Sequence, residues 1–517
     1  MHKTLLIALA TTTMLVAPSH ALDLKVAVQN LPATLDPGKD HSNTGSQIYY
    51  NAFDPLIEKD YAAAEVSFKP GIATEWKQVE PTIFEVKLRD GVKFHNGATV
   101  TAADVVFSFE RIINEATPEF GSVKKQFFNN FEKVEAVDAN TVRFTTFKPE
   151  PLFETLLNTS EGSIVPKAYI AGLSGDPAVV EPSDFDAFGL APVGTGPYSI
   201  QNFQPGEGLT YVKFADYWGD KAPLDSAELR RIPEMATRIT ALANGEVDLI
   251  TNVPPDQLAT IEANPNLKVE GAVTPLFHVV FFNTENPKLA DKRIRQALSM
   301  AIDRNLLNEA LWLGKAVVPS THTYPQYGEL YMPELQTFEY NPEKARELLK
   351  EAGFEGQTVR YDTDPVYYTN GLLAAQAIKE MWAAVGVTMD LKVDPKWTGD
   401  DKDMESRNWS NPMYFADPAG SFGTMWSPTG ARITGGSWKP NEAYSGMWER
   451  FRYSTDIETR KAAYAEIMAY VKEEAPFLVL YQPYESYGMS KSLEWKPLPG
   501  HIPYVLDFRA GAVAFND

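Results

Sequence analysis

Alternating strand-like and helix-like segments constrain the fold of this chain more than any other feature. MATRITALANGEVDLI (235–250) has the pattern of a helix that ends at Asn244-Gly245, followed by a short buried strand. The pattern then restarts: PLFHVVFFNT (275–284) predicts a buried strand, and DKRIRQALSMAIDR (291–304) predicts an amphipathic helix. The sequence therefore predicts an α/β protein in two halves of unequal size.

Capping residues mark one further helix in the second half. In YNPEKARELLKEAG (340–353), Asn341 is expected to cap the helix and Pro342 to occupy its first turn. Gly353 stands where a left-handed residue ends a helix. A helix over about 371–385, between two strand-like segments, predicts another strand-helix-strand unit.

The segment LRDGVKFHNGATVTAADVVFSFERI (88–112) combines two turns, a histidine and a helix start. The Thr101 hydroxyl is expected to cap the amide of Asp104 at the start of that helix. His95 has no second histidine or cysteine at metal-ligand spacing, so we interpret it as structural. The segment therefore predicts scaffold rather than chemistry.

The first 21 residues have the pattern of a secretory signal peptide. MHKTLLIALATTTMLVAPSHA (1–21) has a basic tip at Lys3, an apolar run too short to cross a bilayer, and a small-x-small cleavage pattern at Ser19 to Ala21. The chain has no cysteine, so an exported form is held together by burial rather than by disulfides, and it has neither a thiol nucleophile nor a thiolate metal site.

Charge and motifs exclude several classes of function. A formal net charge of −21 argues against binding of nucleic acid or of an anionic membrane surface. The histidines form no HExxH or HxH pattern and no Walker-type loop occurs, so we expect no metal site and no cofactor. A secreted hydrolase is the alternative of another class. It requires a clustered acid/base or nucleophile set, which local spacing does not provide, so we expect no enzyme.

An aromatic, glycine-rich stretch is the most conspicuous candidate for a binding surface. Residues 397–438 interleave tryptophan, tyrosine and phenylalanine with Arg407, Asn408, Asp417 and Arg432. Flat rings give contact area at low entropic cost and could form a ligand wall. In the alternative interpretation, about half of them belong to the core and the others line the edge of a lobe.

Several motifs in this order resemble the extracellular solute-binding proteins of the peptide-type family, family 5, which serve ABC importers. They are the segment 88–112, GTGPYSI (194–200), DYWG (216–219), the segment 235–250 and VVFFNTENPKLADKRIRQALSMAIDR (279–304). The resemblance extends over nearly the whole chain after the signal segment. It indicates the family and leaves the ligand open.

The resemblance implies a two-lobed periplasmic-binding-protein (Venus flytrap) fold of the α/β class, with an extra subdomain in the first lobe. The implied domains are the signal peptide (1–21), lobe I (22–55, 166–272 and 488–517), the extra subdomain (56–165) and lobe II (273–487). Hinge crossings are implied near 272–277 and 481–489. The implied protein is a periplasmic monomer that captures a small solute by lobe closure and delivers it to an ABC permease in the inner membrane. A sensor or chaperone-like role would share this fold.

The ligand class suggested by the resemblance is a peptide or a peptide-like compound such as an opine. In peptide binders of the family an aspartate of the second lobe takes the ligand's α-ammonium, and FADPAG (415–420) places Asp417 there. Dipeptide binders tend to have an arginine for the ligand carboxylate where TDPVYYTNG (363–371) has none, which argues against simple dipeptides. For Asp417 the alternative role is capping of backbone amides.

An opine sugar-phosphate or an oligosaccharide conjugate is the second candidate ligand class. Arg407 and Arg432 could bind a carboxylate or a phosphate through their planar forks, and tryptophans could stack on sugar rings. The alternative for both arginines is a surface ion pair. Asn43, Thr44 and Ser46 could face the cleft from a helix start or simply cap that helix, and Trp397 could cover the ligand or pack. The complete predicted binding set is Asn43, Thr44, Ser46, Trp397, Arg407, Asn408, Asp417, Trp426, Arg432 and Tyr481.

Overall fold

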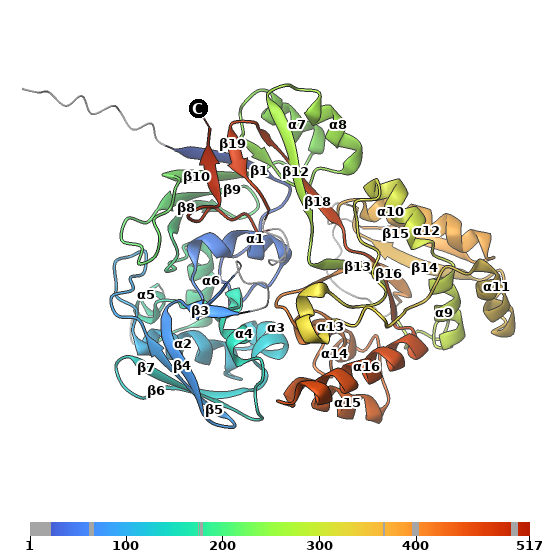
Figure 1. The fold of residues 1–517 in the computed structure, drawn as a ribbon, viewed down its shortest axis with the longest axis horizontal. Coiled ribbons are helices and arrows are strands. Elements are labelled where there is room, and N and C mark those ends of the chain that lie inside the picture. The colour runs from blue at the N-terminus through green and yellow to red at the C-terminus, as the bar shows by residue number, and fades with distance from the viewer. Residues whose placement is uncertain are drawn as a thin grey trace, which may run out of the picture.

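A computed structural model describes residues 22–60, 67–173, 175, 179–365, 368–394, 403–497 and 505–516. The signal segment 1–21 lies outside the described residues. Two large sheets organise the structure, and we call the parts built on them the first and the second lobe (Figure 1). The first lobe contains a seven-stranded sheet, whose order is β12 (Leu267–Val273), β18 (Tyr484–Ser490), β11 (Leu249–Ile250), β1 (Asp23–Val28), β10 (Ser226–Arg231), β9 (Gly208–Lys213) and β8 (Tyr198–Gln204).

The second lobe contains a five-stranded sheet with helices on both faces. Its strand order is β15 (Thr388–Val393), β14 (Thr358–Thr363), β16 (Ser406–Pro412), β13 (Leu276–Phe282) and β17 (Phe477–Tyr481). The helices of this lobe include α9 (Lys292–Met300), α10 (Arg304–Trp312), α11 (Pro342–Glu351), α12 (Gly371–Ala384), α13 (Phe422–Trp426), α14 (Ala431–Thr434), α15 (Glu442–Tyr453) and α16 (Ile457–Glu474).

Strand β13 lies between β16 and β17 in this sheet and is buried along its whole length. Val280 and Phe282 point to a core shared with α9 to α12, whereas Val279 and Phe281 point to the core shared with α13, α15 and α16. Burial on both faces explains why this segment reads as a continuous apolar run instead of alternating. The predicted buried strand over 275–284 is confirmed.

The chain passes between the two sheets at two neighbouring points. β12 is followed by β13 across Thr274 and Pro275, and β17 is followed by β18 across Gln482 and Pro483. The Thr274 amide donates to the Pro483 carbonyl at 3.0 Å, so the two crossings are bonded to each other. Figure 1 shows β12 and β18 running side by side toward the second lobe. The predicted hinge positions and domain boundaries stay predictions.

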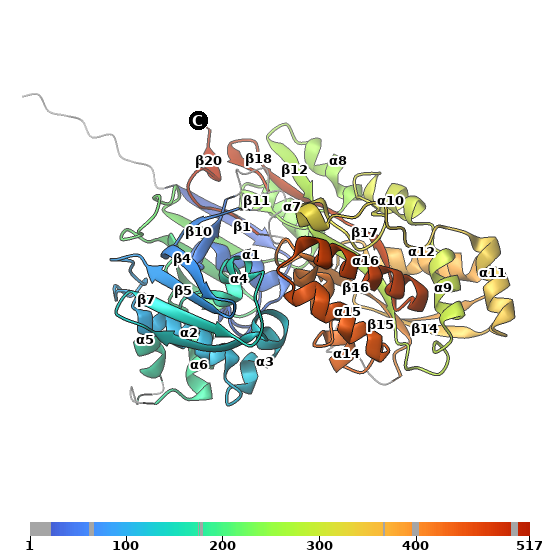
Figure 2. The same ribbon diagram turned by 60° about the horizontal axis from the view of Figure 1, so that its bottom comes forward.

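A four-stranded antiparallel sheet, which we call the extra sheet, extends the first lobe. Its strand order is β4 (Ala73–Glu80), β5 (Ile83–Leu88), β7 (Thr141–Thr146) and β6 (Phe131–Ala136). Helix α2 (Ala102–Ile113) packs against it (Figure 2). The predicted cap of α2 is confirmed, because the Thr101 hydroxyl accepts from the Asp104 amide and the Asp104 carboxylate accepts from the Thr101 amide. His95 accepts from the Gly194 amide at 3.2 Å, and burial lowers its pKa to about 4. Its structural interpretation agrees with this position.

Other predicted helix boundaries also agree with the structure. Asn341 caps α11 by accepting from the Lys344 amide at 2.9 Å, and Gly353 has a φ of +65° after its last turn. Helix α7 (Met235–Ala243) ends at Asn244, and Gly245 follows with a φ of +71°. Each of these glycines adopts a left-handed conformation that a side chain disfavours.

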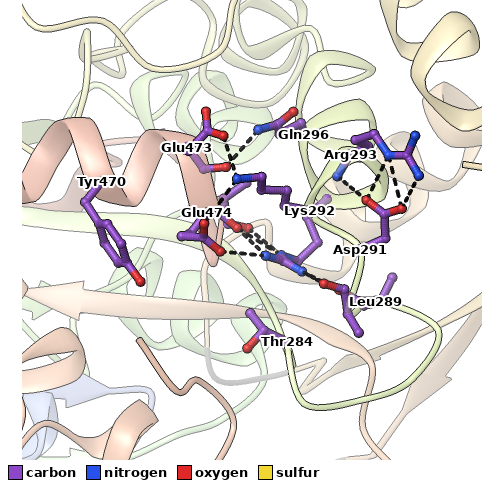
Figure 3. Close-up of polar contacts among 12 residues, drawn as sticks. Thr284, Leu289, Asp291, Lys292, Arg293, Gln296, Tyr470, Glu473 and Glu474 are labelled. Carbon is purple, nitrogen blue, oxygen red and sulfur yellow. Dashed lines mark hydrogen bonds and ion pairs between the residues drawn. The ribbon is translucent and has the colours of Figure 1, made fainter. Parts of the chain in front are cut away.

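Basic and amide side chains of α9 bind the C-terminal end of α16. Lys292 Nζ lies 2.6 Å from a Glu473 carboxylate oxygen, and Gln296 donates to the Glu473 carbonyl at 2.8 Å (Figure 3). The buried Arg295 Nε donates to the Glu474 carbonyl at 3.1 Å. The last carbonyls of a helix lack partners within the helix and carry partial negative charge, so these donors stabilise the end of α16.

A buried ion pair connects helix α2, which packs on the extra sheet, to Asp36 of the first lobe. Arg111 of α2 forms two bonds with the Asp36 carboxylate, at 2.7 and 2.8 Å, and both side chains are at most 1% exposed. The Gly38 amide also donates to Asp36, at 2.9 Å. Removing one partner of such a pair leaves an uncompensated buried charge.

We predict that Asp36→Ala lowers the free energy of unfolding by about 3–5 kcal/mol, because Arg111 then stays buried without a counter-charge. Urea denaturation followed by circular dichroism measures this loss. Lys344→Ala is the control: it removes an exposed ion pair with Glu347 and should change stability little. Equal stabilities of the two variants would contradict the prediction.

Candidate functional site

A cavity of about 70 Å³, partly open to solvent, lies between the two lobes. The first lobe supplies one side through α1 (Asn43–Ala52) and the segment from Thr155 to Ser163. The second lobe supplies Met413 to Ala416, which follow β16. The described lining residues are Ser46, Tyr49, Tyr50, Phe53, Pro55, Lys59, Phe68, Thr155, Asn158, Thr159, Ser160, Ser163, Met413, Tyr414, Phe415, Ala416 and Val505.

Helix α1 begins in a network of short polar side chains. The Ser42 hydroxyl accepts from the Gly45 amide at 3.0 Å and donates to Asp40 at 2.9 Å. The Tyr49 hydroxyl donates to the same Asp40 oxygen at 2.9 Å. These bonds fix the start of α1, so that the side chains at positions 46, 49, 50 and 53 form one helical stripe on the cavity.

The segment from Thr155 to Ser163 contributes hydroxyl and amide groups. Its centre is the 3-10 helix η3 (Ser160–Gly162), which lies against α1. Asn158 donates to the Ile57 carbonyl at 2.8 Å, which ties the segment to β2 (Ile57–Lys59). Burial raises the pKa of Glu161 in η3 to about 7 and lowers the pKa of Lys59. Lys59 is the charged side chain among the described lining residues.

A second, more polar hollow of about 340 Å³ adjoins the cavity. The two share Tyr50, Pro55, Lys59 and Asn158. Arg509 lines the second hollow and pairs with the buried Asp54 at 2.8 Å. The space near the ligand cavity therefore continues toward charged groups of the first lobe.

Of the predicted binding residues, Ser46 lines the cavity. Its hydroxyl is buried and has no hydrogen-bond partner among the described residues. Thr44 lies in the first turn of α1 with its hydroxyl 2.9 Å from that of Ser42, and Ser42 is the residue that caps the helix. Asn43 is half-buried at the same helix start, and neither it nor Thr44 is among the described lining residues.

Asp417 sits in the second lobe with both carboxylate oxygens occupied. One oxygen accepts from the Ala419 amide at 2.9 Å, and the other accepts from Arg460 of α16 at 2.6 Å. The first contact is the amide-capping alternative that the sequence left open. Asp417 is not among the described residues that line the cavity, so its predicted role toward an ammonium stays a prediction.

The two predicted arginines stack on aromatic rings inside the second lobe. The Arg407 guanidinium carbon lies 4.5 Å from the centre of the Trp409 ring, and that of Arg432 lies 4.2 Å from the centre of the Phe281 ring. Both arginines are buried, so the surface ion pairs considered from the sequence do not describe them. Asn408, next to Arg407 on β16, donates to the carbonyl of Gly371 at the start of α12, at 3.3 Å.

The remaining predicted residues lie in the core of the second lobe or outside the described chain. Trp426 stacks on Phe477 at 4.3 Å between ring centres, and Tyr481 is fully buried beside His278. Trp397 lies outside the described residues. From the aromatic stretch, Tyr414 and Phe415 line the cavity, whereas the tryptophans at 426 and 438 are core residues.

Sequence reasoning missed most of the first-lobe wall. Tyr49, Tyr50 and Phe53 follow Ser46 at helical spacing, a pattern that equally describes a buried helix face. The polar run Asn158 to Ser163 between apolar segments marks a loop, and no local signal says that the loop faces a ligand.

The two lobes are joined across the cavity by direct contacts. Arg452 of α15 forms a two-point ion pair with Glu150, at 2.6 and 2.7 Å, and Glu150 is fully buried. The Tyr414 hydroxyl donates to the His41 carbonyl at 2.9 Å. These contacts join the part of the chain with the extra sheet to the second lobe, so the structure has its lobes closed together.

Comparison with known proteins identifies the chain. The family described as bacterial extracellular solute-binding proteins, family 5 Middle, matches residues 67–432. The chain belongs to this family. The predicted family, the two-lobed α/β fold and the role of solute-binding component of an ABC importer rather than enzyme are confirmed. Proteins of this family are extracellular or periplasmic and work with an ABC permease.

Individual relatives span most of this family 5 protein. The dipeptide-binding protein of Escherichia coli (strain K12) is 28% identical over 462 residues, which are 83% of each chain. The glutathione-binding protein GsiB of the same strain is 30% identical over 360 residues, 68% of this chain and 66% of the relative.

Solved structures show the same fold. The periplasmic binding protein DppA from Helicobacter pylori in complex with peptide STSA has a TM-score of 0.85 at 25% identity, with 96% of this chain and 99% of that chain covered. The binding protein AgaA from A. tumefacien R10, in complex with agropinic acid, has a TM-score of 0.81 at 23% identity over 96% and 99% of the two chains. None of the described helices is long and apolar enough to cross a membrane.

We predict that Glu150→Gln destabilises the closed arrangement by about 2–5 kcal/mol, because Arg452 keeps its charge and loses its buried partner. The radius of gyration measured by small-angle X-ray scattering in the presence of ligand should increase, and the apparent Kd should rise at least about tenfold. Glu449→Gln is the matched control, since it removes an exposed pair with Lys148 across the same gap. Unchanged scattering and affinity in Glu150→Gln would show that closure does not depend on the buried pair.

Proposed function

We propose that this family 5 protein binds a peptide or a peptide-like conjugate such as an opine in the cavity between its lobes. The observation that carries the proposal is the composition of the lining. The first lobe supplies hydroxyl and amide groups, the second lobe supplies Tyr414 and Phe415, and Lys59 supplies a cation. Hydroxyl and amide groups suit the N–H and C=O groups of a peptide, rings suit its apolar parts, and a lysine suits its carboxylate.

The space beside the cavity supports a ligand of this class. The cavity itself holds about 70 Å³, and the adjoining hollow of about 340 Å³ falls within the range of about 300–1,000 Å³ that is typical of small-molecule pockets. The adjoining hollow therefore gives a ligand room to extend beyond the cavity. This agrees with the absence of an arginine from the segment 363–371, which argues against simple dipeptides.

The sugar-phosphate alternative depended on Arg407 and Arg432. Both guanidinium groups stack on rings inside the second lobe, and neither arginine is among the described lining residues. We therefore propose the peptide-like class. The relatives named for dipeptide and glutathione binding support it, since both names denote ligands built from amino acids.

We further propose that residues 1–21 direct export to the periplasm, and that the mature protein is a monomer. It delivers its solute to a permease in the inner membrane. Closure of the lobes around the solute, with Arg452 and Glu150 in contact, forms the complex that the permease receives.

Native mass spectrometry of protein purified without denaturation identifies a retained solute, and thermal shift against peptides, opines and phosphosugars tests the class. We expect stabilisation by peptides of three to five residues or by opines. Stabilisation by phosphosugars alone would overturn the proposal.

We predict that Lys59→Met weakens binding of a peptide with a free carboxylate by about 10- to 100-fold, because a charge-assisted hydrogen bond contributes about 1.5–3 kcal/mol. Isothermal titration calorimetry measures the change. The same peptide with an amidated C-terminus is the control, and its affinity should not depend on Lys59. Equal losses for both peptides would assign Lys59 a structural role.

A further inference from the structure

A buried carboxyl group lies directly behind the first-lobe wall of the cavity. Glu161 in η3 is 2% exposed. One of its oxygens, Oε2, accepts from the hydroxyl of the lining residue Ser160 at 3.1 Å. Its other oxygen, Oε1, is buried and has no hydrogen-bond partner among the described residues. A carboxyl group in this position is incompletely satisfied by the protein.

The charged side chain that acts on Glu161 is Asp40, which precedes α1 and is also acidic. Tyr49 of α1 lies near both groups and is uncharged, because burial raises its pKa well above 10. Within the described part of the chain, no lysine, arginine or histidine forms an ion pair with Glu161. Burial, with a smaller contribution from Asp40, raises the pKa of Glu161 to about 7. A cation brought near this group would supply the counter-charge that the protein does not.

One lining hydroxyl connects this carboxyl group to the cavity, and a second lies on the same wall. The Ser160 hydrogen is directed to Glu161, so the remaining lone pair of that hydroxyl can accept a bond from the cavity. The Ser46 hydroxyl of α1 also lines the cavity and is buried without a partner in the described chain. This part of the wall is therefore built to accept N–H donors.

We propose that the wall formed by Ser46 and Ser160 receives the amino end of the ligand, and that Glu161 is the positioning residue that orients Ser160 and supplies the negative charge. The inference rests on the proposed function, since it assigns one end of a peptide-like ligand. Lys59 lies on the same cavity and takes the carboxylate end, so the two groups together favour a zwitterionic ligand. This assignment places ammonium recognition in the first lobe, whereas Asp417 pairs with Arg460 in the second.

The test compares peptides of three to five residues with free and with N-acetylated amino ends, by isothermal titration calorimetry between pH 5 and 7. Peptide ammonium groups, whose pKa is about 7.7–8.0, stay protonated over this range. Glu161 is mostly protonated at pH 5 and must release its proton when an ammonium binds. Affinity for the free-amine peptides should therefore fall as the pH falls, by up to about tenfold per pH unit, whereas affinity for the acetylated peptides should stay constant.

Glu161→Gln keeps the shape of the side chain and cannot ionise. We expect it to lose the pH dependence and to bind free-amine peptides about 10- to 100-fold more weakly at pH 7, with unchanged binding of acetylated peptides. The wild-type comparison needs no variant, so it stands even if Glu161→Gln does not fold. Binding of both peptide sets with equal affinity and no pH dependence overturns this inference and leaves the proposed function intact. Failure of every peptide and every opine to bind overturns both.

Discussion

The mutual bonding of the two chain crossings is the constraint on which the rest of the structure depends. The ladder between β12 and β18 ends at the pair Val273 and Tyr484, one residue before Thr274 and next to Pro483. A proline has no amide hydrogen and a fixed φ, so neither strand continues as a regular ladder into the second lobe. The change of direction between the lobes is thereby confined to a few residues. Two-lobed proteins close through changes in backbone φ and ψ at such positions. The residues that line the cavity belong to the two lobes on either side of these crossings.

Buried ion pairs then determine how the parts fit together. Arg111 holds Asp36 where the extra sheet meets the first lobe, and Arg452 holds Glu150 where that sheet meets the second lobe. Such pairs need not add net stability over apolar residues, because both charges lose their hydration. They do penalise any arrangement that separates them in a dry interior. The pair between Glu150 and Arg452 therefore favours one specific closed position of the lobes.

The side chains of the candidate site are of common types, and their proposed roles depend on their positions in the fold. Ser46, Ser160 and Lys59 carry no local signal of binding in the sequence, and the roles proposed for them depend on α1, η3 and β2 lining one cavity. Glu161 shows the same effect in its pKa, which burial raises to about 7. The charge of that group thus depends on the packing of η3 against α1 and on what occupies the cavity.

The sequence alone determined the α/β class, the family, the buried strand β13 and the caps of helices such as α2 and α11. These features depend on local periodicity and on side chains that bond to amides within a few residues, so a linear pattern carries them. The binding wall depended on tertiary structure. Asp417 and Arg460 are 43 residues apart, and Glu150 and Arg452 are 302 residues apart. No local pattern encodes such pairings, and the aromatic residues at 426 and 438 read alike as core or as ligand wall until the packing of the second lobe buries them.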